Sequence, residues 1–143
     1  MSPKIRVVAL CVFRRDDGTI LVGISDGPSD GRHFYRPLGG GVEFGESAEE
    51  AVAREIQEEL GAEIHSVRRL GVLDQCFTFD GKPKHEVAFI FDARFADESF
   101  SAREHITGVE ANGLPIHALW ILPRNADLPL FPNGLTELLD SVL

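Results

Sequence analysis

The sequence predicts an α/β fold in which a mixed β-sheet is sandwiched between helices (α/β/α). Three observations support this prediction: several Val- and Ile-rich segments typical of strands, an acid-rich helix near the middle, and an amphipathic helix at the end. The 143 residues contain no repeat, low-complexity tract or Pro/Ser-rich linker. We therefore expect one domain spanning residues 1–143.

The first strands are predicted at residues 5–13 and 19–25, which are both rich in Val, Ile and Leu. Asp17-Gly18 lies between them and is a strong hairpin signal, so we expect the chain to open with a hairpin.

A second pair of strands is predicted at residues 67–79 and 85–95, on either side of Asp80-Gly81. Within 85–95, alternate residues are apolar, which predicts one core-facing side made of Val87, Phe89, Phe91, Ala93 and Phe95. A further strand is predicted at 117–122.

The central helix is predicted at residues 48–60. Ser47 followed by Glu50 fits a capping box, and Gly61 fits the left-handed position that ends many helices. The last helix is predicted at 134–142, where a core-facing stripe is formed by Leu135, Leu138, Leu139 and Val142.

Charge and apolar patterning exclude several kinds of partner. Lys plus Arg is 14 and Asp plus Glu is 23, a net charge of −9, so a nucleic-acid polymer is not expected as a partner. The apolar run 7–13 is too short to span a bilayer, so no membrane partner is expected either. Cys11 and Cys76 are interpreted as core thiols of a cytoplasmic protein rather than as a disulfide.

The central helix concentrates acids beside its apolar stripe. At about 100° per residue, Glu55, Glu58 and Glu59 fall within one arc of about 100°. Because like charges at this spacing repel, the arc predicts a positive partner, and a hard divalent cation with oxygen ligands fits best. Arg54 lies at the edge of the arc, where we expect it to orient one acid rather than neutralise three. A solvated acidic surface is the alternative for the helix alone.

A glycine-rich segment, Gly39 to Gly41 with Gly45, comes just before this helix. We interpret it as a loop whose backbone can approach a ligand closely, so that carbonyl groups and carboxylates converge on one place.

The spacing of the whole segment resembles the Nudix box of the Nudix hydrolases. Gly40 is followed after five residues by Glu46 and after seven more by Arg54-Glu55-Ile56-Gln57-Glu58-Glu59-Leu60-Gly61. The family prefers a bulky aliphatic residue next, where this chain has Ala62, which we interpret as a packing position.

The resemblance implies the Nudix fold and hydrolysis of a phosphoanhydride bond in a nucleoside diphosphate linked to another group, with Mg²⁺ or Mn²⁺ as cofactor. It further implies that Gly40, Glu55, Glu58 and Glu59 bind metal. Arg54 and Glu46 would hold the helix and loop in place. The general base would be a box residue such as Glu58 or Glu55, or a later acid among Glu98, Glu104 and Glu110, of which we favour Glu110.

Arg36, Tyr35 and His85 are candidate substrate-binding residues, although core packing for the aromatic ring and a surface position for the histidine are the ordinary alternatives. The identity of the substrate and the existence of a homodimer are left open. Two other functions also remain: a Nudix-fold binding or regulatory domain without turnover, and an acidic structural domain without a ligand.

Overall fold

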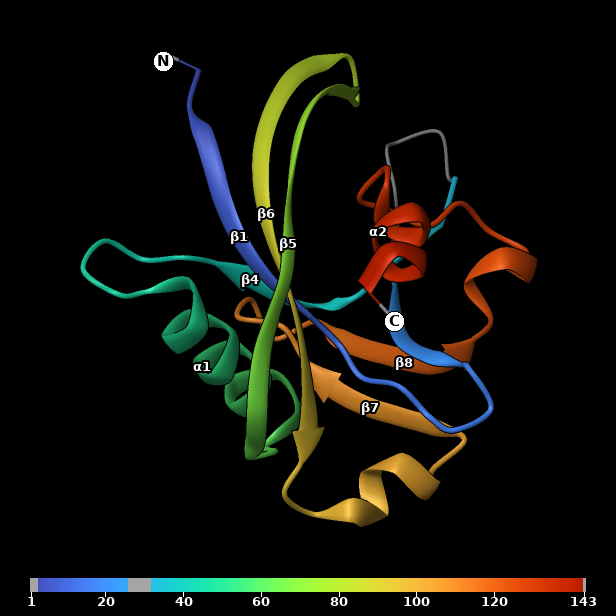
Figure 1. Ribbon diagram of the computed structural model, residues 1–143. Helices are drawn as coiled ribbons and strands as arrows, with labels where there is room; N and C mark the ends of the chain where they lie inside the picture. Colours follow the sequence, from blue (N-terminus) through green and yellow to red (C-terminus); the bar gives the residue numbers. More distant parts are fainter. Residues whose placement is uncertain (1–2, 26–31, 143) are drawn as a thin grey trace.

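The computed structural model describes residues 3–25 and 32–142. Its strands are β1 Ile5–Val12, β2 Ile20–Ser25, β3 Phe34–Arg36, β4 Leu38–Gly41, β5 Ile64–Phe79, β6 Lys82–Phe95, β7 His105–Val109 and β8 Pro115–Ile121. Its helices are α1 Ala48–Leu60 and α2 Leu135–Val142, with short 3₁₀ helices η1 Glu98–Ala102 and η2 Pro123–Asn125. Figure 1 shows α1 and α2 on opposite sides of the long β5–β6 hairpin.

The strands form two four-stranded sheets. The first has the order β4-β1-β6-β5 and is mixed, because β1 runs parallel to β6 and antiparallel to β4. The second has the order β3-β2-β8-β7 and is antiparallel throughout. These sheets and helices confirm the predicted α/β class. Among the described residues, no helix is long and apolar enough to cross a membrane.

The predicted opening hairpin is wrong in its pairing. Gly18 turns the chain with a φ of 88°, but β1 and β2 belong to different sheets and their segments meet in one isolated bridge, Arg14 with Ile20. Five of the eight residues of β1 and the first three residues of β2 are buried, and the strands pair with β4 and β6 and with β3 and β8, respectively, instead of with each other.

The prediction of a loop at the glycine segment is also wrong, because Gly39 to Gly41 belong to strand β4. The strand runs so close to β1 that a Cβ added to Gly39 would stand 2.0 Å from the carbonyl oxygen of Ala9. The φ of Gly39 is 145°, which favours glycine as well. Sequence patterns also missed β3 and β7, which are only three and five residues long.

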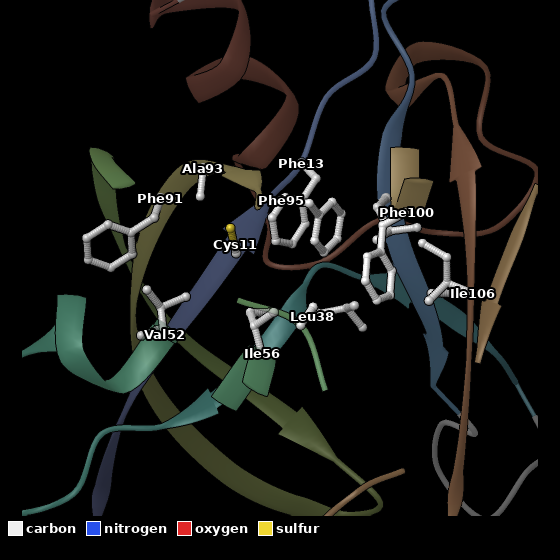
Figure 2. Close-up of a cluster of buried hydrophobic side chains, with 14 of the residues drawn as sticks. Cys11, Phe13, Leu38, Val52, Ile56, Phe91, Ala93, Phe95, Phe100 and Ile106 are labelled. Atoms are coloured by element: carbon white, nitrogen blue, oxygen red, sulfur yellow. The ribbon is translucent and has the colours of Figure 1, made fainter. Parts of the chain in front are cut away.

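Two clusters of buried side chains make the core. One joins α1 to both sheets and includes Val52, Ile56, Leu38, Cys11 and Phe91, which Figure 2 shows pointing toward one another. The other cluster lies between the sheets and α2, whose Leu135 and Leu139 are buried. The predicted terminal helix is therefore confirmed, although its Val142 is exposed.

Two smaller expectations hold only in part. The predicted core face of β6 is confirmed at Phe91, Ala93 and Phe95, but its other face is buried as well, because Ala88 and Ile90 belong to the second cluster. Cys11 is buried, and burial raises the pKa of its thiol, but Cys76 is exposed on the edge strand β5.

Candidate metal and active site

Helix α1 has the predicted bounds and caps. The Ser47 side chain accepts a hydrogen bond from the Glu50 backbone, and the Glu50 side chain accepts one from Ser47 N–H. Gly61 ends the helix in the left-handed conformation, with a φ of 66°. The buried residues Val52 and Ile56 fix the rotation of the helix, which turns its glutamates toward β4.

The carboxylate of Glu55 lies against the backbone of Gly40. A Cβ added to Gly40 would stand 2.5 Å from Glu55 Cδ and 2.6 Å from its Oε2. Only glycine therefore fits at position 40 while Glu55 keeps this position. The strand and the helix bring a backbone group and a carboxylate to one place, as the sequence predicted.

Arg54 donates hydrogen bonds to three carboxylates, whereas the sequence led us to expect that it orients one. Its Nη2 donates to Glu46 Oε1 at 2.6 Å, and its Nη1 donates to Glu55 Oε1 at 3.0 Å and to Glu58 Oε2 at 3.3 Å. A further hydrogen bond reaches the Gly41 carbonyl at 3.0 Å. The guanidinium of Arg54 thus connects α1 to β4, through Gly41, and to the loop that precedes α1, through Glu46.

Glu59 carries the strongest electrostatic perturbation in the acidic arc. Its Oε1 accepts a hydrogen bond from the Gly39 N–H at 3.1 Å. Burial, followed by repulsion from Glu55, Glu110 and Glu58, raises the pKa of Glu59 to about 8. Burial thus disfavours a negative charge on Glu59, and the neighbouring acids add to this effect.

Of the three later acids Glu98, Glu104 and Glu110, Glu110 is the one whose charge helps to raise the pKa of Glu59. Glu110 is therefore the later acid that we associate with this cluster. It follows β7, whose Gly108 packs so tightly on α1 that a Cβ there would stand 2.1 Å from the carbonyl oxygen of Glu59. Hydrogen bonds between Glu110 and Leu114 and between Gly113 and Glu110, both 2.8 Å, close a tight turn. Gly108 was missed at the sequence level; a glycine inside a short strand was its only signal.

The three candidate substrate-binding residues lie in different surroundings. Arg36 donates from Nη2 to Glu86 Oε1 at 2.5 Å. Tyr35 is 4% exposed, and its hydroxyl donates to Asp127 at 2.6 Å. His85 lies with Nε2 2.7 Å from Asp74 Oδ1 on the neighbouring strand. None of these contacts joins the α1 carboxylates.

The donor set fits a divalent cation. Over residues 3–25 and 32–142, no three His, Cys, Asp or Glu side chains stand ready to hold a metal ion in their present positions. Glu55, Glu58 and Glu59 nevertheless lie on adjacent turns, and Glu55 and Glu59 lie next to the glycine backbone. Burial, and then repulsion from Glu55 and Glu58, raises the pKa of Glu59. Oxygen donors with excess negative charge are what Mg²⁺ and Mn²⁺ prefer.

The fold and the site together define an α/β protein whose glycine strand and acidic helix form one carboxylate centre. Comparison with models of known protein families shows which family this chain belongs to, because the NUDIX domain model matches residues 4–132. The chain belongs to the NUDIX family. The resemblance to this family, which rested on the box at Gly40 to Ala62, is thereby confirmed.

Relatives of known name agree with this assignment. A protein called MutT4 from Mycobacterium tuberculosis is 29% identical over 138 residues, which covers 87% of this chain and 55% of that protein. The NAD-capped RNA hydrolase NudC of Pseudomonas fluorescens is 28% identical over 126 residues, covering 88% and 42% respectively. This chain thus spans about half the length of the curated relatives it matches.

A solved structure is similar over nearly the whole chain. The crystal structure of the MutT NUDIX hydrolase from Burkholderia pseudomallei superposes with a TM-score of 0.71 at 28% identity, covering 98% of this chain and 99% of that one.

Proposed function

We propose that this protein is a Nudix-type hydrolase that uses Mg²⁺ or Mn²⁺ to cleave a phosphoanhydride bond in a nucleoside diphosphate linked to another group. The observation that supports this most is the packing of Glu55 and Glu59 against the glycine strand, with Glu58 beside them on the helix, where the pKa of Glu59 rises to about 8. A site of this kind gains from binding a cation and, through the cation, an anionic substrate.

Each group of the site has a proposed role. The Gly40 carbonyl, Glu55, Glu58 and Glu59 would hold the cation, which would supply positive charge to the phosphate oxygens. Arg54 and Glu46 keep the helix, the preceding loop and β4 in register through their 2.6 Å ion pair.

A proton acceptor for the attacking water is also required. Glu58 lies in the box, and Glu110 lies in the tight turn after β7, where its charge acts on Glu59, so these two acids are the candidates. Their roles separate experimentally, because loss of Glu58 would also weaken metal binding, whereas loss of Glu110 would leave it largely intact.

The substrate is proposed as a small nucleoside diphosphate derivative. The name of NudC says that it hydrolyses NAD-capped RNA, whereas the names of MutT4 and of the MutT hydrolase state no substrate. The acidic charge of this chain favours a small molecule over a polymer. Arg36, Tyr35 and His85 stay candidates for contacts with it. A cytoplasmic location, one domain and a homodimer stay predictions.

A phosphate-release screen tests the proposal. Nucleoside triphosphates, nucleotide sugars, ADP-ribose, dinucleotides and dinucleoside polyphosphates would each be incubated with the protein and Mg²⁺. Turnover of at least one class, abolished by chelator, is expected. Binding of a nucleotide without any turnover would instead indicate the alternative, a Nudix-fold binding or regulatory domain.

A further inference from the structure

A charged cluster outside the acidic helix joins Arg36, already a candidate for substrate contact, to two residues that have no role so far, Arg6 and Glu86. Glu86 on β6 is the one charged residue that is buried among the described residues, with 8% exposure. Its Oε1 accepts a hydrogen bond from Arg36 at 2.5 Å, and its Oε2 lies 4.0 Å from Nη1 of Arg6 on β1. Two guanidinium groups share one carboxylate, so the cluster is net positive.

This cluster lies beside the glycine strand, on the face away from α1. Successive residues of a strand point to opposite faces, and Gly40 faces Glu55 on the α1 side. Gly41 therefore faces the other side, where a Cβ added to it would stand 3.6 Å from Arg6 Nη2. Strand β4, at the edge of its sheet, separates an acidic face from a basic one.

The two arginines differ in freedom. The Arg36 side chain is 25% exposed and held by a short hydrogen bond, whereas the Arg6 side chain is 61% exposed and, within residues 3–25 and 32–142, has only the 4.0 Å ion pair. Arg54, the other cation near β4, already donates to three carboxylates. Of these three arginines Arg6 is thus the most exposed and the least engaged, which leaves its donors free for a ligand, and guanidinium groups bind phosphate oxygens well.

We propose that Arg6 is a substrate-binding residue that holds a phosphate of the substrate on the basic side of β4, with Glu86 as the positioning residue that orients it. The inference rests on the proposed function, since the reacting phosphate would be held on the α1 side of the same strand. Strand β4 has no side chains at Gly40 and Gly41, so a diphosphate can lie across its edge. One phosphate would then lie near the acidic centre and the other near Arg6.

Titration of inorganic pyrophosphate in the presence of Mg²⁺, followed by calorimetry, tests the inference without turnover. Arg6→Gln is expected to weaken binding roughly ten- to hundred-fold, the usual effect of losing a hydrogen bond to a charged group. Arg124→Gln is the matched control, because Arg124 is an exposed arginine on η2 paired with Asp140, and its loss should leave binding unchanged. The exposure of Arg6 makes misfolding of the variant a minor concern.

Equal affinity of Arg6→Gln and the native protein, or no pyrophosphate binding to the native protein, would overturn the inference. If no substrate is turned over while Arg6→Gln still weakens pyrophosphate binding, the proposed hydrolysis fails and the phosphate site stands.

The positioning role of Glu86 is tested on the substrate found in the screen. Glu86→Gln should raise KM several-fold with little change in kcat, and Glu86→Asp, which keeps the charge, should recover part of the loss. A fall in kcat at unchanged KM would contradict a positioning role.

Discussion

The carboxylate of Glu55 occupies the space above Gly40 that a side chain would otherwise fill, with Cδ 2.5 Å from the position of an added Cβ. This relationship explains why the glycine segment and the acidic helix depend on each other. Gly40 keeps its backbone accessible to the carboxylate, and the helix rotation set by Val52 and Ile56 brings Glu55 to it.

Gly40→Ala is therefore expected to displace Glu55 and to weaken Mg²⁺ binding at least ten-fold while the protein stays folded. Ligand displacement of this kind commonly costs 10- to 100-fold in metal affinity. Gly41→Ala is the control for metal affinity, because its Cβ would meet only Arg6 atoms at 3.6 Å and 3.8 Å, an ordinary contact. Equal metal affinity for Gly40→Ala and the native protein would contradict the assigned geometry.

Arg54→Lys removes a planar group that contacts three carboxylates at once. A single ammonium cannot reach Glu46, Glu55 and Glu58 together, so we expect turnover to fall about 10- to 100-fold. Steady-state kinetics at saturating Mg²⁺ measure the effect. Circular dichroism would verify that the helix persists. Native kinetics in the variant would show that the contacts of Arg54 with the three carboxylates are dispensable.

Glu59 predicts a pH dependence of stability in metal-free protein. The pKa of its carboxyl is raised from about 4.5 to about 8 by folding, so the folded state binds the proton more tightly than the unfolded state. Its stabilising contribution is complete below pH 4.5 and is lost as the pH rises through 8. Glu59→Gln should remove this loss and be more stable at pH 9 by up to about 5 kcal/mol, because the shift of about 3.5 pKa units corresponds to about 1.4 kcal/mol per unit.

Urea unfolding in chelator at pH 5 and pH 9 measures this difference. The exposed Glu63, just past the helix end, provides the control Glu63→Gln. A Glu59→Gln variant that loses stability between the two pH values as steeply as the native protein does would refute the assignment.

Gly108→Ala tests the contact between β7 and α1. The added methyl group would stand 2.1 Å from the carbonyl oxygen of Glu59 and 2.9 Å from Leu60 Cδ2, so the backbone must shift. Overpacking of this kind costs about 1–3 kcal/mol. Thermal unfolding should show a lowered Tm, and an unchanged Tm would mean that the strand moves away without cost.

The acidic helix was predictable from the sequence because its signals are local. The Ser47 cap, the Gly61 end and the spacing of Glu55, Glu58 and Glu59 all lie within fifteen residues, and each was confirmed in place. The choice of Glu110 over Glu98 and Glu104 gained support from its electrostatic effect on Glu59, although its role stays a prediction.

Features that depend on distant contacts could not be predicted in this way. Strand β1 pairs with β6, which lies some eighty residues later in the chain. The apolar residues of β1 would suit this pairing and a hairpin with β2 equally well, so no local pattern distinguishes the two. The reach of Arg54 to Glu46 and Gly41 depends on how the loop before α1 folds back. The Glu86 cluster likewise joins β1, β3 and β6.

The dependence of turnover on Mg²⁺ concentration in the native protein and in Glu58→Gln tests the central claim most directly. With the substrate found in the screen, the native protein should be inactive in chelator and saturate with Mg²⁺, whereas Glu58→Gln should show much lower turnover, a higher half-saturating Mg²⁺ concentration, or both. Turnover that persists in chelator, or a Glu58→Gln variant with native turnover and native metal dependence, would contradict a metal centre built on the carboxylates of α1.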